Sequence, residues 1–212
     1  MHCSFASKLF NTLLMNALIV NSSGRTELSV SRKLVAELVA ELSSKHPDLH
    51  TTHRDVATDL PFVNDPMIAG FYIPAEQRTP EQAQAVAFSD QLAQELIAAD
   101  VLVIGAPIYN FTVPASLKAW VDLVCRAGLT FKASPAGYEG LLHGKKAYVV
   151  VTSGGVPVGS PYDLTSSYLR QVLGFIGITD VTIIGAGQLS VLGEQQPLAD
   201  ARTAIKALHA AA

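Results

Sequence analysis

The sequence VLVIGAPIYNFTVP, residues 101–114, joins a short apolar run to a polar, aromatic turn. The run over residues 101–106 is continuous and rich in β-branched side chains, which is typical of a strand buried on both faces of a parallel sheet. Beyond the turn, apolar side chains recur at helical spacing, and Pro114 suits the first turn of that helix. Ligands bind at the carboxyl ends of strands in open α/β sheets, so we expect residues 107–113 to contact a ligand.

Three further apolar runs of β type lie at residues 17–20, 147–152 and 181–184, with helical patterns between them. A fifth and weaker run, residues 49–56, alternates polar and apolar side chains and indicates an edge strand. Strands that alternate with helices predict a parallel sheet covered by helices on both faces. We therefore predict an α/β fold with a doubly wound, five-stranded parallel sheet.

The composition of the 212 residues argues against several classes of protein. With 49% hydrophobic and 16% charged residues, the chain can bury a sizeable core in one domain. The net charge of -3 and the lack of a Lys and Arg cluster argue against a nucleic-acid partner. No apolar run approaches the roughly 20 residues of a membrane helix, so we expect no membrane partner. Cys3 and Cys125 lack CxxC spacing, which favours reduced thiols and a cytoplasmic protein.

Residues 1–14 precede a second methionine, Met15, which stands directly before the first predicted strand. The apolar part of this segment is interrupted by Asn11 and Thr12, and no small-residue cleavage site follows, which is unlike a signal peptide. We therefore interpret residues 1–14 as an N-terminal extension and residues 15–212 as a single domain.

Sequence patterns typical of helices recur along the rest of the chain. The segment after the first strand repeats leucine at every fourth position, and Thr79 with Gln82 forms a capping box that opens another helix. The stretch 57–78 is longer than ordinary α/β loops, so we expect a functional loop or an interface arm there. Near the C-terminus we predict an irregular stretch over residues 185–198 and then a helix over residues 198–211.

The turn after the first strand, residues 21–31, is rich in hydroxyls and opens directly into a helix. Hydroxyls and free N–H groups at the positive end of a helix dipole can bind a phosphate dianion without a lysine. The glycine patterns GxGxxG and GxxxxGK[ST] are absent, which argues against the dinucleotide and ATP sites built on them. A simpler interpretation is that Ser29 is only an N-cap and Ser31 only a first-turn residue.

A third turn, Thr152 to Val156, again follows a predicted strand and contains Ser153, Gly154 and Gly155. Paired glycines let backbone amides approach a planar ring closely, and they permit positive φ values. A phosphate-binding turn, an aromatic turn and a Gly-Gly turn at one sheet edge would together hold a flat, phosphorylated cofactor. Flavin mononucleotide (FMN) has that shape.

In these turns the chain resembles the FMN-dependent NADH:azoreductase family, flavodoxin-like proteins that reduce azo dyes and quinones. The resemblance covers the chain from Met15 to its end, and the order and spacing of its motifs make it specific. The matching segments are residues 107–111, 117–118, 122, 126–128, 130–131, 139–140, 144–146, 152–155 and 173–178.

The resemblance also implies which residues form the site. Backbone N–H groups near Asn110 and Gly154 would stabilise negative charge on the reduced flavin, so no side chain has to act as acid or base. Phe131 and Phe175 would close the substrate pocket across the interface of a homodimer. We expect no metal site, because His50 and His53 have no third ligand nearby in sequence. The cofactor-binding residues would be Ser23, Ser29, Val30 and Ser31 at the phosphate, Pro107, Ile108, Tyr109, Asn110 and Phe111 along the isoalloxazine ring and the ribityl chain, and Thr152, Ser153, Gly154 and Gly155 at the pyrimidine edge.

The expected function is an FMN-dependent NAD(P)H oxidoreductase that reduces quinones and cleaves aromatic azo compounds by a ping-pong, two-electron mechanism. The donor stays open between NADH and NADPH, because no motif recognises the 2′-phosphate. One alternative is a flavodoxin-like electron carrier or flavin-binding sensor without turnover. A hydrolase is a further alternative, but the sequence has neither a Ser-His-Asp elbow nor clustered metal ligands to support it.

Overall fold

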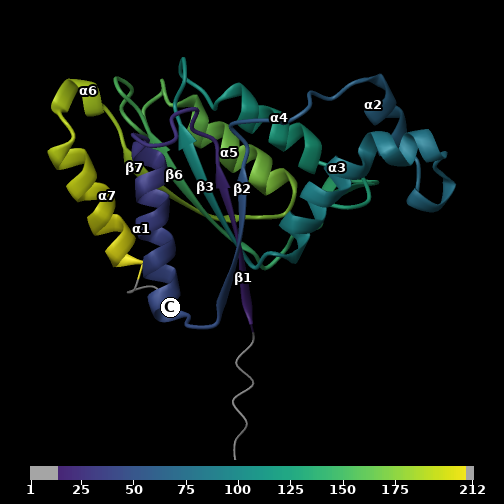
Figure 1. Cartoon of the computed structure of the whole chain (residues 1–212), viewed down its shortest axis with the longest axis horizontal. Coiled ribbons are helices and arrows are strands. Elements are labelled where there is room, and N and C mark those ends of the chain that lie inside the picture. The colour runs from purple at the N-terminus through teal and green to yellow at the C-terminus, as the bar shows by residue number, and fades with distance from the viewer. Residues whose placement is uncertain (1–13, 209–212) are drawn as a thin grey trace, which may run out of the picture.

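The structure, a computed structural model, describes residues 14–208 (Figure 1). Five parallel strands form the main sheet in the order β2-β1-β3-β6-β7, so the predicted doubly wound, five-stranded α/β fold is confirmed. All but the last residue of the predicted extension, residues 1–14, lies outside the described residues. The strands are β1 (Met15–Asn21), β2 (Leu49–Asp55), β3 (Val101–Pro107), β6 (Lys146–Thr152) and β7 (Asp180–Ala186). The main helices are α1 (Val30–Lys45), α3 (Pro80–Ala98), α4 (Ala115–Val124), α5 (Leu164–Phe175) and α7 (Gln195–Ala207).

Two cores lie on opposite faces of the sheet. Helices α1 and α7 cover one face, whereas α3, α4 and α5 cover the other (Figure 1). Side chains alternate along each strand, so Leu102 and Ile104 pack in the core with α3, α4 and α5, while Val101 and Val103 pack with α1. All of β3 is buried, as expected for the central strand of a parallel sheet.

The helix starts follow the sequence signals. The Ser29 side chain is the N-cap of α1 and accepts a hydrogen bond from the Arg32 N–H. The capping box predicted for Thr79 and Gln82 is present at the start of α3, with both of its hydrogen bonds. These caps satisfy N–H groups that have no partner within a helix.

Three segments depart from the sequence predictions. The stretch 57–78 is not one loop, because it contains α2 (Asp65–Phe71) and the 3₁₀ turn η1 (Ala75–Gln77). The strands β4 (Phe131–Ser134) and β5 (Gly137–Gly140) form an antiparallel hairpin that the sequence did not indicate. The predicted irregular stretch 185–198 is also partly wrong, because it contains α6 (Leu189–Leu192) and the start of α7. Helix α7 can begin before residue 198 because a proline is tolerated in its first turn.

The segment with α2 and η1 extends from the body of the molecule beside α3 (Figure 1). A partly buried cluster attaches it there: Arg126 and Arg78 each form an ion pair with the Asp90 carboxylate at 2.7 Å, and the Arg126 guanidinium lies 4.1 Å from the centre of the Phe71 ring. Burial lowers the pKa of Arg126, although Asp90 opposes this effect. The segment therefore has a defined attachment to α3.

Candidate functional site

Three predicted turns meet at the carboxyl edge of the sheet, beyond β1, β3 and β6. The chain leaves β1 toward β2 on one side and returns to β3 on the other, so the gap between β1 and β3 is the switch point at which open α/β sheets bind ligands. A cavity of about 240 Å³ lies there. It is lined by Ser23, Arg25, Leu28, Ser29, Val30, Ser31, Pro107, Ile108, Tyr109, Thr152, Ser153, Gly154, Leu189, Ser190 and Glu194.

Direct hydrogen bonds join the three turns. The Gly24 N–H donates to the Tyr109 hydroxyl at 3.2 Å, which connects the first turn to the second. The Ile108 N–H donates to the Thr152 carbonyl at 2.7 Å, which connects the second turn to the third. The three segments therefore form one continuous wall around the cavity.

The first turn presents buried hydroxyls at the start of α1. Ser29 and Ser31 are both buried, and their Oγ atoms lie 3.1 Å apart. Only one hydroxyl proton can lie in that bond, so the other is available to a ligand. The first-turn N–H groups of Val30 and Ser31 have no partner within the helix. This arrangement suits an anion with several acceptor oxygens, so the N-cap interpretation and the phosphate interpretation of Ser29 are compatible.

The second turn holds two residues in an unusual backbone conformation. Asn110 has φ of 48° and Phe111 has φ of 75°, in the left-handed region that residues other than glycine rarely adopt. Hydrogen bonds between Tyr109 and Thr112, of 2.9 and 3.2 Å, close the turn around them. Phe111 is 52% exposed. Backbone strain of this kind is characteristic of functional turns.

The third turn corrects one expectation from the sequence. Neither Gly154 nor Gly155 has a positive φ. Space at Gly154 is tight instead, because a Cβ atom there would lie 3.0 Å from the Ser190 Oγ, whereas a Cβ on Gly155 would meet no atom within 4 Å. The Ser190 N–H donates to the Gly154 carbonyl at 2.9 Å, so this turn is tied to α6.

The structure brings most predicted cofactor residues together, but not all of them. Asn110, Phe111 and Gly155 lie in the same turns yet do not line the cavity. Asn110 lines an adjacent cavity of about 580 Å³ with Tyr109 and Tyr168. Conversely, the sequence did not predict the lining residues that come from the segment around α6, because that segment has no motif. These residues are Leu189, Ser190 and Glu194.

The two predicted substrate-pocket residues lie elsewhere in the chain. The rings of Phe131 and Phe175 are 4.6 Å apart, and both contact the exposed Tyr138 of the β4–β5 hairpin. The first residue of α5, Leu164, donates its N–H to the Phe111 carbonyl at 3.0 Å, whereas Phe175 is the last residue of that helix. Twelve helical residues separate these ends by about 17 Å. Within one chain, this aromatic cluster therefore does not reach the cavity.

Charged groups surround the first turn. Arg32 and Asp55 form a two-bond ion pair, and the hydrogen bond from Arg32 lowers the pKa of the Asp55 carboxyl.

Within residues 14–208 no group of three or more His, Cys, Asp or Glu side chains could hold a metal ion. In that same range no helix has the length and apolarity needed to cross a membrane.

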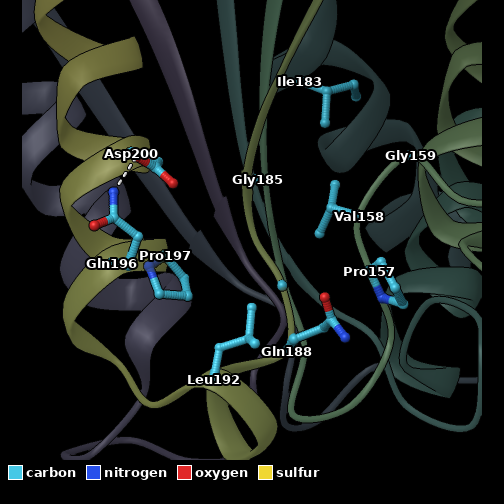
Figure 2. A pocket seen from close by; sticks show the side chains of 11 residues that line it. Pro157, Val158, Gly159, Ile183, Gly185, Gln188, Leu192, Gln196, Pro197 and Asp200 are labelled. Atoms are coloured by element: carbon cyan, nitrogen blue, oxygen red, sulfur yellow. Dashed lines mark hydrogen bonds between the residues drawn. The ribbon is translucent and has the colours of Figure 1, made fainter.

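A larger cavity of about 410 Å³ lies beside β7 (Figure 2). Pro157 and Val158 form one wall, and Gln196 and Asp200 of α7 form the other. The Gln196 Nε2 donates to the Asp200 carboxylate at 2.8 Å, and Asp200 is the only charged residue of the lining. We call this cavity the β7 groove.

Comparisons with known proteins agree with this geometry. The sequence profile of the flavodoxin-like fold family matches residues 15–209. The FMN-dependent NADH:quinone oxidoreductase 1 of Hahella chejuensis is 50% identical over 188 residues, which cover 89% of this chain and 92% of that protein. The FMN-dependent NADH:quinone oxidoreductase of Azotobacter vinelandii is 46% identical over 184 residues, with 86% and 92% covered. The crystal structure of an azoreductase from Bacillus anthracis str. Sterne superposes with a TM-score of 0.81 at 29% identity, covering 91% of this chain and 99% of that one. The chain therefore belongs to the family of FMN-dependent NADH:quinone oxidoreductases and azoreductases, and its fold is flavodoxin-like.

Proposed function

We propose that this protein is an FMN-dependent NAD(P)H oxidoreductase that reduces quinones and cleaves aromatic azo compounds. The observation that carries the proposal is the cavity between β1 and β3, where buried serine hydroxyls meet the N–H groups at the start of α1. Two relatives that are 50% and 46% identical have names that include FMN, NADH and quinone.

The donors of this cavity fit a flavin phosphate. Ser23, Ser29, Val30 and Ser31 offer hydroxyl and N–H donors, and Arg25 adds a positive charge to the lining. A phosphate monoester needs several donors around three oxygens, which this set can supply. We propose that these four residues hold the phosphate.

The other two turns suit the rest of the cofactor. Pro107, Ile108 and Tyr109 form the inner wall along which the ribityl chain would lie, and Asn110 and Phe111 extend that wall outward. The segment from Thr152 to Gly155 would meet the pyrimidine edge of the ring. We propose that N–H groups near Asn110 and Gly154 stabilise the negative charge that builds on that edge.

FMN, when bound, supplies two-electron transfer from a nicotinamide donor to an aromatic acceptor. The chain itself has to orient the ring, exclude water and donate hydrogen bonds to it. A ping-pong order follows if donor and acceptor use the same exposed ring face in turn. The exposed aromatic side chain of Phe111 offers a surface beside that face for flat substrates.

We also propose that the protein is a homodimer, in which Phe131 and Phe175 of one subunit close the substrate pocket of the other. The exposed Tyr138 beside them supports an interface at this cluster. A monomeric mass by light scattering, together with full activity, would contradict this proposal.

A cytoplasmic location is supported by the free thiol of Cys125 and by the use of a nicotinamide donor.

The function is tested by purifying the protein and recording its flavin spectrum. Oxidation of NADH and of NADPH is then followed with a benzoquinone and with methyl red as acceptors. We expect a yellow protein that oxidises at least one donor with both acceptors. A colourless protein that FMN does not reconstitute would exclude the proposal, whereas a yellow protein that oxidises neither donor would favour the carrier or sensor.

A further inference from the structure

We propose that Arg32 is a positioning residue that makes the cavity selective for a phosphorylated flavin over an unphosphorylated one. It would act by fixing the backbone of the first turn, residues 23–25, against Asp55 at the end of β2. This inference rests on the proposed binding of FMN and assigns a role to a side chain that does not line the cavity.

The Arg32 guanidinium makes four hydrogen bonds. Its Nη1 and Nη2 donate to the two Asp55 carboxylate oxygens at 2.7 and 2.9 Å. Its Nη2 also donates to the Ser23 carbonyl at 2.8 Å, and its Nε donates to the Arg25 carbonyl at 3.0 Å. One side chain thus holds two carbonyls of the turn, those of Ser23 and Arg25.

These contacts set the direction of the peptide groups in the turn. In a trans peptide the C=O and N–H bonds point in opposite directions. Because the Ser23 carbonyl is held by Arg32, the N–H of the same peptide, on Gly24, points to the other side, where it donates to the Tyr109 hydroxyl at 3.2 Å. Arg32 therefore determines how the first turn meets the second.

The same residue is connected to the phosphate donors. The Arg32 backbone N–H donates to the Ser29 Oγ at 3.3 Å, and that oxygen lies 3.1 Å from the Ser31 Oγ. The Arg32 side chain is only 18% exposed, and Asp55 is itself fixed by the Ala57 N–H at 3.0 Å. The first turn and the start of α1 are therefore held, through Arg32, by Asp55 at the end of β2.

The charge balance argues for positioning rather than direct binding. Asp55 neutralises the Arg32 guanidinium, and four of its five N–H donors are already occupied. Arg25 lines the cavity, and no ion pair joins it to another residue between 14 and 208, so the direct electrostatic contribution belongs to Arg25. A planar, forked donor is needed to bond two carbonyls and a carboxylate together, and a lysine cannot replace it.

The experiment compares FMN with riboflavin, which differ only in the phosphate. Apoprotein is prepared from the wild type, Arg32→Gln and Arg32→Lys, and the dissociation constant of each flavin is measured by fluorescence quenching. We expect both variants to lose roughly 30-fold in FMN affinity and less than about threefold in riboflavin affinity, because the proposed phosphate donors lie in and beside the turn, whereas Tyr109 is the one residue along the ring and ribityl chain that bonds to it. The matched control is Arg202→Gln, which removes a similar two-bond ion pair with Glu37 (2.8 and 2.9 Å) on α1 and α7 and should change neither constant.

Asp55→Asn provides a second variant in case Arg32→Gln folds poorly. It leaves the guanidinium in place but removes its charged anchor, so we expect an FMN-selective loss that is smaller than that of Arg32→Gln. Equal losses for both flavins, or unchanged FMN affinity in the folded variants, would overturn the inference. A wild-type protein that binds neither flavin would instead contradict the proposed function.

Discussion

The cavity between β1 and β3 and the β7 groove lie near the same edge of the sheet, yet they offer different chemistry. The groove is larger, at about 410 Å³ against about 240 Å³. Its lining has one charged residue, Asp200, and the helix beside it, α6, has four residues and no side-chain cap. The smaller cavity has the start of the 16-residue helix α1, with its capping serine. Size therefore does not identify the site, whereas the density of donors does.

The difference follows from strand order. At β1 and β3 the chain leaves the sheet in opposite directions, so the turns diverge and their N–H groups stay open to a ligand. β7 is an edge strand with no such neighbour, and the Val158 side chain packs directly on its Gly185.

The largest effect should come from placing a carboxylate among the phosphate donors. Ser31→Asp adds a negative charge at a buried position that would face the phosphate in the proposed site, so we expect FMN affinity to fall by roughly 100-fold or more. The variant should still fold, because an acidic residue in the first turn of a helix is favourable. The measurement is a fluorescence titration with FMN.

The matched control adds the same charge to the other cavity. Gln196→Glu places a carboxylate in the β7 groove, on the exposed surface of α7. Its FMN affinity should stay within about twofold of the wild type. Similar losses in Ser31→Asp and Gln196→Glu would mean that the smaller cavity is not the phosphate site.

An intermediate effect is expected in the Gly-Gly turn. Gly154→Val would press a side chain against Ser190, since even a Cβ would lie 3.0 Å from its Oγ, whereas Gly155→Val enters open space. We expect roughly tenfold weaker FMN binding for Gly154→Val and little change for Gly155→Val. Isothermal titration calorimetry on the two apoproteins measures both; a reversed order would show that Gly155, not Gly154, approaches the cofactor.

The sequence predicted the fold because its main signals are local. The run at 101–106 and the capping box at Thr79 depend on neighbouring residues alone, and both elements are present in the structure. The meeting of the three turns was predictable for a related reason, since the carboxyl ends of parallel strands lie at one edge, whereas the choice of cofactor residues within them came from the family resemblance. Ten of the predicted cofactor residues line the same cavity: Ser23, Ser29, Val30, Ser31, Pro107, Ile108, Tyr109, Thr152, Ser153 and Gly154.

The missed features depend on contacts between distant parts of the chain. Glu194 lines the cavity because α6 folds back onto the Gly-Gly turn, which no periodicity indicates. The proposed role of Arg32 on α1 requires Asp55, 23 residues later at the end of β2, to lie beside it. The positive φ values fall on Asn110 and Phe111, not on the paired glycines, because turn closure between Tyr109 and Thr112 determines them.

A smaller effect should follow from the strain at Asn110. Asn110→Val puts a β-branched side chain at φ of 48°, so we expect a loss of about 1 kcal/mol in the free energy of unfolding, while Asn110→Gly should lose little or none. Urea denaturation of the apoproteins measures this difference. If Val and Gly at this position are equally stable, the turn is not left-handed in solution.

The smallest effect is expected at Cys125, which ends α4 and lines neither cavity. Burial, with a smaller contribution from Asp122, raises the pKa of its thiol from 9.0 to about 12. In a Cys3→Ala background, the native thiol should therefore react with a disulfide reagent at pH 8 far more slowly than in urea, with or without FMN. As pH rises above about 9, the thiol of the unfolded chain loses its proton before that of the folded chain. The contribution of Cys125 to the free energy of unfolding is therefore lost between about pH 9 and about pH 12. Rapid labelling of the native protein at pH 8 would show that the end of α4 opens, and a change on adding FMN would connect that opening to the cavity between β1 and β3.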